Sequence, residues 1–287
     1  MIPTVTLNDG TAIPQLGFGT WGIQPDTRTT PEHTAIAAEV IARALELGYR
    51  HLDTAQRYGT ESGIGRAIAE SGIPRDELYV TSKLWVSHFG AGDLRRSYDM
   101  TLDHLGLEQL DLFLIHWPET AGHGDEYISA WLTLTELVAE GRLRSAGVSN
   151  FMPHHLDALE REVGVKPVVN QIEIHPHFAN TSARTATWAR GIAVAAWSPL
   201  SMGRTLFDDE VLASVGERHG KSIAQVALRW HLDQGHIVVP RTVVTDEMRQ
   251  NLDVFDFELS AGDTAIIEGR DRGEDGRLGP HPDTAEH

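Results

Sequence analysis

Residues 144–198 read RSAGVSNFMPHHLDALEREVGVKPVVNQIEIHPHFANTSARTATWARGIAVAAWS and contain three short apolar runs. These runs cover residues 144–150, 167–173 and 192–198, and longer stretches with mixed polarity separate them. Short apolar runs that alternate with helical patterns are typical of buried strands in a parallel sheet. This stretch therefore predicts repeated strand–helix units.

The same unit recurs on both sides of this stretch. The further runs cover residues 16–21, 51–54, 79–85, 110–117 and 236–241. Between runs, Thr30-Pro31 and Gly48 delimit one predicted helix, and Ser222 and Gly235 delimit another. Eight alternating units favour a closed (β/α)8 TIM barrel. An open doubly wound sheet is the alternative, but Gly63-x-Gly65 lacks the third glycine of a dinucleotide fingerprint.

The two ends of the chain carry other patterns. Residues 4–7 and 12–14 flank Asn8-Asp9-Gly10, which predicts an N-terminal β-hairpin. Residues 270–287 are polar and rich in glycine and proline, which indicates a frayed end or, as we expect, a loop over the active-site end of the barrel. No internal linker or repeat is visible, so residues 1–287 are interpreted as a single domain.

Composition excludes several classes of function. The chain has 24 Lys and Arg against 41 Asp and Glu, a net charge of −17, which disfavours binding to nucleic acid or to anionic membranes. Cysteine is absent, so disulfides, thiolate metal sites and cysteine nucleophiles are excluded. No apolar stretch is long enough to span a bilayer, and residues 1–10 do not resemble a secretory signal. We therefore expect a cytoplasmic protein.

Functional groups of a barrel of this type lie at the carboxyl ends of its strands. Reading those ends gives Trp21, Asp53, Lys83, Trp85, His116, Trp117, Ser149, Asn150, Gln171, Trp197 and Arg241. Four of the seven tryptophans are in this set, which predicts a cavity with flat apolar walls suited to a ring-bearing ligand and a small organic substrate.

Asp53, Lys83 and His116 follow neighbouring strands, and Tyr58 lies in the loop after Asp53. A buried lysine needs a carboxylate partner, which Asp53 can supply. A lysine cation beside a phenol lowers the phenol pKa, so we expect the Tyr58 pKa to fall towards neutrality. Tyr58 would then protonate an oxygen, with His116 orienting it, while hydride reaches the adjoining carbon.

The chain resembles the aldo-keto reductase family, and within it the bacterial diketogluconate reductases. The segments that carry the resemblance are HLDTAQRYG (51–59), TSKLW (81–85), LIHWP (114–118), GVSNF (147–151), VNQIE (169–173), WSPL (197–200), ALRW (227–230) and NLDVFDF (251–257). The resemblance implies a (β/α)8 barrel and nicotinamide-dependent, metal-free reduction of small carbonyl compounds by a monomer. It implies Tyr58 as general acid, Lys83 and Asp53 as the pair that tunes it, and His116 as the carbonyl-orienting group.

The resemblance also implies positions for cofactor and substrate. The implied cofactor-binding residues are Thr20, Trp21, Asp53, Ser149, Asn150, Gln171, Trp197, Ser198, Pro199, Leu200, Ser201, Arg241, Thr242, Glu247, Gln250 and Asn251. Among them, Trp197 corresponds to the ring that stacks on nicotinamide. The implied substrate-binding residues are Trp21, Tyr58, Trp85, His116 and Trp117.

The adenosine end departs from the family pattern, which usually has Pro-Lys-Ser and an arginine six residues after the lysine. Here Pro240-Arg241-Thr242 stands in that place and Glu247 replaces the arginine. Arginine binds phosphate well, whereas a carboxylate repels it. We expect NADP(H) to be preferred by a reduced margin, with NAD(H) also used.

Two other functions are alternatives for the same barrel. A sensor or channel subunit would bind nicotinamide on this barrel without turnover. A metal-dependent barrel hydrolase would use Glu173, His175 and His177, although Pro176 interrupts their alternation. Outside the site, Trp131, Trp188 and Trp230 are predicted core residues, and Glu274, Asp275 and Asp283 are predicted to be solvated.

Overall fold

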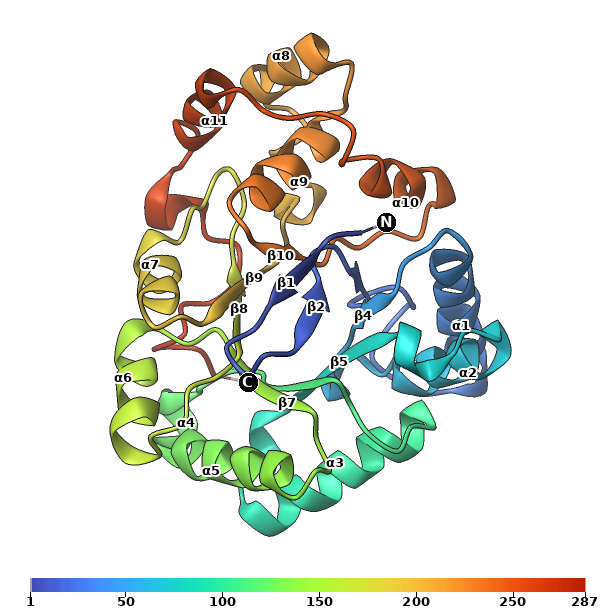
Figure 1. Cartoon of the computed structure of the whole chain (residues 1–287), viewed down its shortest axis with the longest axis vertical. Helices are drawn as coiled ribbons and strands as arrows, with labels where there is room; N and C mark the ends of the chain where they lie inside the picture. Colours follow the sequence, from blue (N-terminus) through green and yellow to red (C-terminus); the bar gives the residue numbers. More distant parts are fainter. Residues whose placement is uncertain (1, 287) are drawn as a thin grey trace.

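The protein is described here by a computed structural model that covers residues 2–286, apart from the side chains at positions 120 and 121. Eight parallel strands follow one another around a single sheet in chain order, from β3 to β10. Helices surround them, and the hairpin β1–β2 lies across the middle of the ring (Figure 1). The strands are β1 (Thr4–Thr6), β2 (Ala12–Pro14), β3 (Phe18–Gly19), β4 (His51–Asp53), β5 (Tyr79–Leu84), β6 (Leu112–Ile115), β7 (Ser145–Ser149), β8 (Val169–Glu173), β9 (Ala193–Trp197) and β10 (Ile237–Val238).

The sheet closes on itself between its first and last strands. Val238 N–H donates to the Gln15 carbonyl (2.8 Å) and Gly17 N–H donates to the Val238 carbonyl (2.8 Å). Gly19 N–H continues this ladder to the Pro240 carbonyl (3.0 Å). The predicted (β/α)8 barrel is confirmed, and the open doubly wound alternative is wrong.

Helices connect successive strands, as a right-handed parallel barrel requires, and two further helices follow the last strand. They are α1 (Pro31–Glu46), α2 (Glu61–Ser71), α3 (Ala91–Leu105), α4 (Thr120–His123), α5 (Glu126–Ala139), α6 (Pro153–Glu162), α7 (Thr181–Ala189), α8 (Glu210–His219), α9 (Ile223–Asp233), α10 (Thr245–Leu252) and α11 (Ala261–Glu268). The two predicted helix starts are confirmed: Thr30 Oγ1 accepts from His33 N–H (3.1 Å), and Ser222 Oγ accepts from Gln225 N–H (3.3 Å). Between residues 2 and 286, no helix combines the length and apolar character needed to cross a bilayer.

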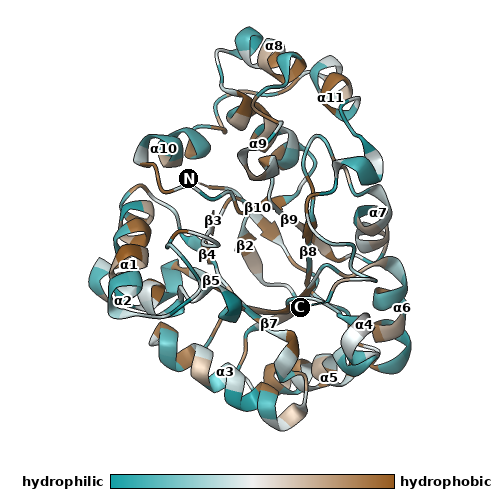
Figure 2. Cartoon of the chain, turned by 180° about the vertical axis from the view of Figure 1, so that it is seen from behind, coloured by the Kyte–Doolittle hydropathy of each residue, from teal (hydrophilic) through white to brown (hydrophobic). Residues whose placement is uncertain are grey.

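The core has two parts. A large cluster fills the space between the strands and the surrounding helices, whereas a smaller one joins the hairpin to the barrel interior. Hydrophobic residues follow the strands, and hydrophilic ones cover much of the outer helical surface (Figure 2). In the smaller cluster Leu7 and Ile13 pack with Tyr79, Leu112 and Val169, near the amino ends of their strands. The predicted hairpin is confirmed, and it plugs the barrel end opposite the carboxyl ends of the strands.

Two expectations need correction. The strands are shorter than the apolar runs that predicted them; for example, the run 236–241 contains only the strand Ile237–Val238. Residues 239–241 extend beyond the carboxyl end of this strand and line the cavity described below, whereas His236 precedes the strand. Trp131 and Trp230 are buried as predicted, but Trp188 is 40% exposed. Its ring stacks on that of His236 (5.2 Å between centroids) and covers the barrel wall from outside.

Candidate active site

A cavity of about 880 Å³ lies at the carboxyl ends of the strands. It is lined by the predicted site residues with two exceptions, Lys83 and Ser201. Lys83 is fully buried and pairs with Asp53, which lines the cavity. Ser201 is buried in the short turn after β9 and does not line the cavity, so its predicted direct contact with a cofactor is not supported by its position.

Asp53 ends β4 and Lys83 lies in the adjacent strand β5, so their side chains meet inside the barrel. Lys83 Nζ donates to Asp53 Oδ1 (2.5 Å) and to the Thr54 carbonyl (2.9 Å). The second carboxylate oxygen of Asp53 accepts from Gln171 Nε2 (2.7 Å). The buried ion pair is therefore satisfied by hydrogen bonds as well as by charge, which a buried pair requires.

Tyr58 ends the one-turn helix Gln56–Tyr58 that follows β4. The loop is fastened to the neighbouring β3–α1 loop by Gln24, whose side-chain amide donates to the Gly59 carbonyl (3.3 Å). Gly59 has φ +72°, and a Cβ there would lie 2.3 Å from the Thr27 carbonyl oxygen. Glycine is thus needed for the approach of the two loops, which aims the Tyr58 side chain into the cavity.

Burial and charge act in opposite directions on Tyr58. Burial raises the pKa of the phenol, and the nearby Lys83 ammonium lowers it, with a net pKa above the ordinary value. The expectation of a lowered Tyr58 pKa is therefore wrong, because the loss of solvation outweighs the attraction of the cation. Burial would lower the pKa of Lys83, but Asp53 and Tyr58 raise it overall, so this lysine stays charged.

Aromatic rings connect Tyr58 with the cavity walls. The His116 ring lies edge-on to the Tyr58 ring (5.6 Å between centroids) and to the Trp85 ring (5.3 Å). Trp117 is buried, whereas Trp21 is 55% exposed at the rim. The predicted tetrad and the three predicted aromatic walls therefore come together around one end of the cavity.

The side chains after β7, β8 and β9 form a second group. Trp197 Nε1–H donates to Asn150 Oδ1 (2.8 Å), and Asn150 Nδ2 donates to the His116 carbonyl (3.0 Å). Ser149 Oγ donates to the Gln171 carbonyl (2.8 Å). These bonds fix the edge of the Trp197 indole and leave the ring among the cavity-lining residues.

The far end of the cavity is formed by the β10–α10 segment. The Arg241 guanidinium donates to the Trp21 carbonyl (3.0 Å) and to the Gly22 carbonyl, so it spans the joint where the barrel closes. Thr242 Oγ1 donates to the Glu247 carboxylate, which lies in the first turn of α10. Arg241 and Glu247 therefore both face this end with part of their hydrogen-bonding capacity already used.

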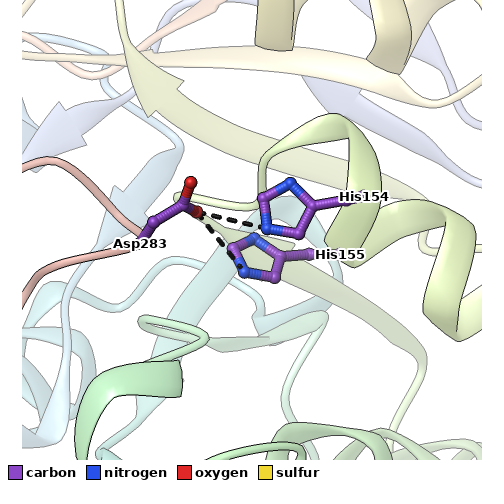
Figure 3. A group of neighbouring side chains, drawn as sticks. All are labelled: His154, His155 and Asp283. Carbon is purple, nitrogen blue, oxygen red and sulfur yellow. Dashed lines mark ion pairs between the residues drawn. The ribbon is translucent and has the colours of Figure 1, made fainter.

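The C-terminal tail lies over the same barrel end, as expected. Glu173 accepts hydrogen bonds from the backbone N–H groups of Leu278 (2.6 Å) and Gly279 (3.0 Å), and Gly279 and Pro280 line the cavity. Further along the tail, Asp283 contacts two histidines in the first turn of α6 (Figure 3). Its Oδ1 lies 3.2 Å from His154 Nε2 and 3.7 Å from His155 Nε2. Asp283 is exposed, as predicted, and it also takes part in a contact of the tail with α6.

Two groups of side chains can be compared with a metal site: the predicted Glu173, His175 and His177, and the group drawn in Figure 3. In both, the side chains already have hydrogen-bond partners within the described residues. Glu173 is occupied by the tail N–H groups, and His177 Nε2 pairs with Asp209 (2.8 Å) away from it. In the group of Figure 3, His155 Nδ1 accepts from Met152 N–H (3.1 Å). This bond places the imidazole proton on Nε2, the atom that faces Asp283, so His155 fits a hydrogen-bond donor better than a metal ligand.

Several cavity-lining residues were not among the predicted site residues. They are Gly19, Arg57, Met202, Gly203, Phe207, Ser222, Ile223, Ala224, Val239, Pro240, Val243, Val244, Gly279 and Pro280. Most belong to loops and to the start of α9, where no periodicity or motif marks a binding residue. Arg57 had a detectable signal, since a charged side chain beside the tetrad tyrosine is unusual for the segment it resembles.

Comparison with known proteins agrees with this geometry. Residues 15–272 match the aldo/keto reductase family. The chain belongs to this family. An aldo-keto reductase of Mycolicibacterium smegmatis is 44% identical over 99% of this chain and 98% of its own length. Methylglyoxal reductase DkgA of Escherichia coli is 40% identical over 98% of each chain. A crystal structure of a Gox0644 variant in complex with NADPH aligns with this aldo/keto reductase at a TM-score of 0.91, with 39% identity and full coverage of both chains.

Proposed function

We propose that this aldo/keto reductase reduces aldehydes or ketones to alcohols with NADPH, and that Tyr58 is the general acid. The observation that carries the proposal is the buried Asp53–Lys83 pair beside Tyr58 and His116 at the base of an aromatic cavity. The names of two similar proteins support it, since one is a methylglyoxal reductase and the other was crystallised with NADPH.

The residues of the cavity fit a nicotinamide dinucleotide along its length. Trp197 offers a flat ring whose orientation is set by Asn150. Ser149, Asn150 and Gln171 offer hydroxyl and amide groups for the nicotinamide carboxamide, and Ser198, Pro199 and Leu200 line the middle. At the far end the lining residues Arg241, Thr242, Gln250 and Asn251 provide donors for the adenosine part. When bound, NADPH supplies the hydride.

The chain's own residues account for the proton. Because its pKa is raised, Tyr58 is protonated at neutral pH and can donate to the carbonyl oxygen as negative charge develops there. The Lys83 ammonium stabilises the phenolate that remains, and Asp53 keeps Lys83 charged despite burial. His116 contacts the Tyr58 ring and can orient the carbonyl oxygen. In this proposal a monomeric enzyme acts in the cytoplasm.

The direct test measures NADPH oxidation with methylglyoxal by the wild-type protein and by Tyr58→Phe. We expect steady turnover by the wild type and a kcat at least about 10²-fold lower for the variant, the usual scale of general acid catalysis. The Kd for NADPH should stay nearly unchanged. NADPH binding without turnover of any aldehyde would favour the sensor or channel subunit. A variant with more than about a tenth of the activity would assign the proton to another group.

A further inference from the structure

Arg57 places a cation at the substrate end of the cavity. It directly precedes Tyr58 in the helix Gln56–Tyr58, is exposed, and lines the cavity. Its guanidinium carbon lies 5.4 Å from the centroid of the Trp85 ring, and that ring lies 5.3 Å from the ring of His116. One aromatic side chain therefore separates the cation from the group proposed to orient the carbonyl.

The base of this arrangement is held in place by Gln56. Its amide nitrogen donates to the Ser97 carbonyl (3.1 Å) and to Thr101 Oγ1 (3.0 Å). Its amide oxygen accepts from the Trp85 backbone N–H (2.9 Å). Gln56 anchors both the turn that carries Arg57 and the backbone of Trp85, so these two segments keep their relative position without a ligand. A ligand that binds there would lose less entropy than one that has to order the loop.

The other charged side chains that line the cavity already have protein partners. Asp53 is paired with Lys83, Arg241 donates to the Trp21 carbonyl, and Glu247 accepts from Thr242. Within residues 2–286, no carboxylate lies within ion-pair distance of Arg57, and its guanidinium donates no hydrogen bond to this part of the chain. Its contact with Trp85 leaves the planar edge of the guanidinium available for a ligand.

We propose that Arg57 binds a carboxylate of the substrate, so that the preferred substrates are aldehydes or ketones that carry a carboxylate a few carbon atoms from the carbonyl. A guanidinium binds a carboxylate through two parallel hydrogen bonds, and the Trp85 face shields one side of the pair from water. The net charge of −17 opposes the approach of an anionic substrate, so a local cation in the cavity favours its binding. The inference rests on the proposed function, because it concerns the substrate of the same site.

The test compares two substrates that differ mainly in charge, 4-formylbenzoate and 4-formylbenzamide. For the wild type we expect kcat/KM to be about tenfold higher for the carboxylate, through a lower KM, and we expect this preference to fall as salt concentration rises. In Arg57→Gln the two values should become nearly equal, because only the carboxylate loses a partner. Activity towards the amide should fall by less than activity towards the carboxylate, because the amide has no charge to pair with the guanidinium, whereas loss of a merely structural contact would lower both equally.

Two further variants separate local binding from net charge. Arg57→Lys keeps the charge but not the planar fork, so it should retain part of the preference. Arg66→Gln makes the same change of charge on α2, outside the cavity, where Arg66 pairs with Glu70, and should leave the ratio as in the wild type.

Equal kcat/KM values in the wild type would overturn the inference, as would an equal loss for both substrates in Arg57→Gln. If neither of these compounds nor methylglyoxal were reduced, the proposed function would fail instead. Calorimetric binding of the corresponding alcohols, 4-(hydroxymethyl)benzoate and 4-(hydroxymethyl)benzamide, in the presence of NADP⁺ would then decide. Tighter binding of the carboxylate that depends on Arg57 would support the inference, and equal binding of the two alcohols would overturn it.

Discussion

The buried carboxylate of Glu173 accepts a hydrogen bond from the backbone N–H of Gly279 (3.0 Å). This bond holds the tail against the indole of Trp197 so closely that a Cβ on Gly279 would lie 2.7 Å from the edge of the ring. Glu173 ends β8 and does not line the cavity, whereas Gly279 and Trp197 do. A residue outside the cavity therefore sets the position of one of its walls.

Replacing Glu173 by glutamine should loosen the tail. The N–H groups of Leu278 and Gly279 bind different carboxylate oxygens, and glutamine replaces one of these oxygens with an NH2 group, so one backbone N–H then faces another donor. We expect faster cleavage by trypsin after Arg277 and a higher KM for the carbonyl substrate, with a far-ultraviolet circular dichroism spectrum like that of the wild type. Asp275→Asn is the matched control, since it removes one charge from an exposed residue of the same tail, two residues before Arg277. Equal cleavage rates in the two variants would contradict a role for Glu173 as the tail anchor.

Replacing Glu247 by arginine should increase the preference for NADPH. Glu247 lines the end of the cavity that we propose holds the adenosine, where its charge would repel a 2′-phosphate. Each removed repulsion or added attraction would be worth about 1 kcal/mol at a partly exposed site. The ratio of kcat/KM for NADPH to that for NADH should therefore rise by about tenfold or more, mainly through the KM for NADPH.

The control for this change is Asp246→Arg, which alters the charge by the same amount at the adjoining residue. Asp246 is exposed, pairs with Arg249, and does not line the cavity. If both variants changed the cofactor ratio equally, the effect would come from the overall field of the protein. A wild type that favours NADH would show that the expected preference itself is wrong.

The pH dependence of carbonyl reduction should follow the direction of the Tyr58 pKa. Reduction needs the protonated phenol, and burial raises its pKa above the ordinary value of 10.0. The phenol is therefore protonated throughout the neutral range, and kcat should stay level from about pH 6 to 9 and fall only at higher pH. A kcat that falls as the pH rises through 7 would instead indicate that bound cofactor or substrate lowers the Tyr58 pKa.

Acid should weaken the fold in part through His155. Burial lowers the pKa of this imidazole from 6.5 to about 4, so the unfolded chain takes up a proton that the folded chain does not. His155 therefore contributes stability above pH 6.5, and this contribution is lost as the pH falls towards 4. Through one such group, lowering the pH from 6.5 to 4.5 reduces the free energy of unfolding by about 2 kcal/mol.

The measurement is the free energy of unfolding in urea at both pH values for the wild type and His155→Gln. The loss of unfolding free energy between pH 6.5 and pH 4.5 should be smaller in the variant by about 2 kcal/mol. His154→Gln is the control, since His154 adjoins His155 in the sequence but is exposed. A pH dependence unchanged by His155→Gln would show that His155 is already protonated in the fold or remains neutral in the unfolded chain.

The sequence by itself determined the barrel, the hairpin and the end of the barrel that holds the site. Apolar runs of strand length, separated by capped helices, bury their side chains in a parallel sheet, and eight such units without a dinucleotide fingerprint favour the closed ring over the open sheet. Once that is so, Asp53, Lys83 and His116 must meet, because neighbouring parallel strands present their carboxyl ends together. These conclusions follow from local pattern, which is why they did not need the tertiary structure.

Only the tertiary structure decided how the loops complete the site. The direction of the Tyr58 pKa depends on a balance between burial and the Lys83 charge, and the degree of burial is a property of the packed loop. The anchor between Glu173 and Gly279 joins segments that are far apart in the chain, as does the contact of Arg241 with the Trp21 carbonyl. Such contacts depend on loop conformations that carry no sequence period, so their partners cannot be found from the pattern of either segment alone.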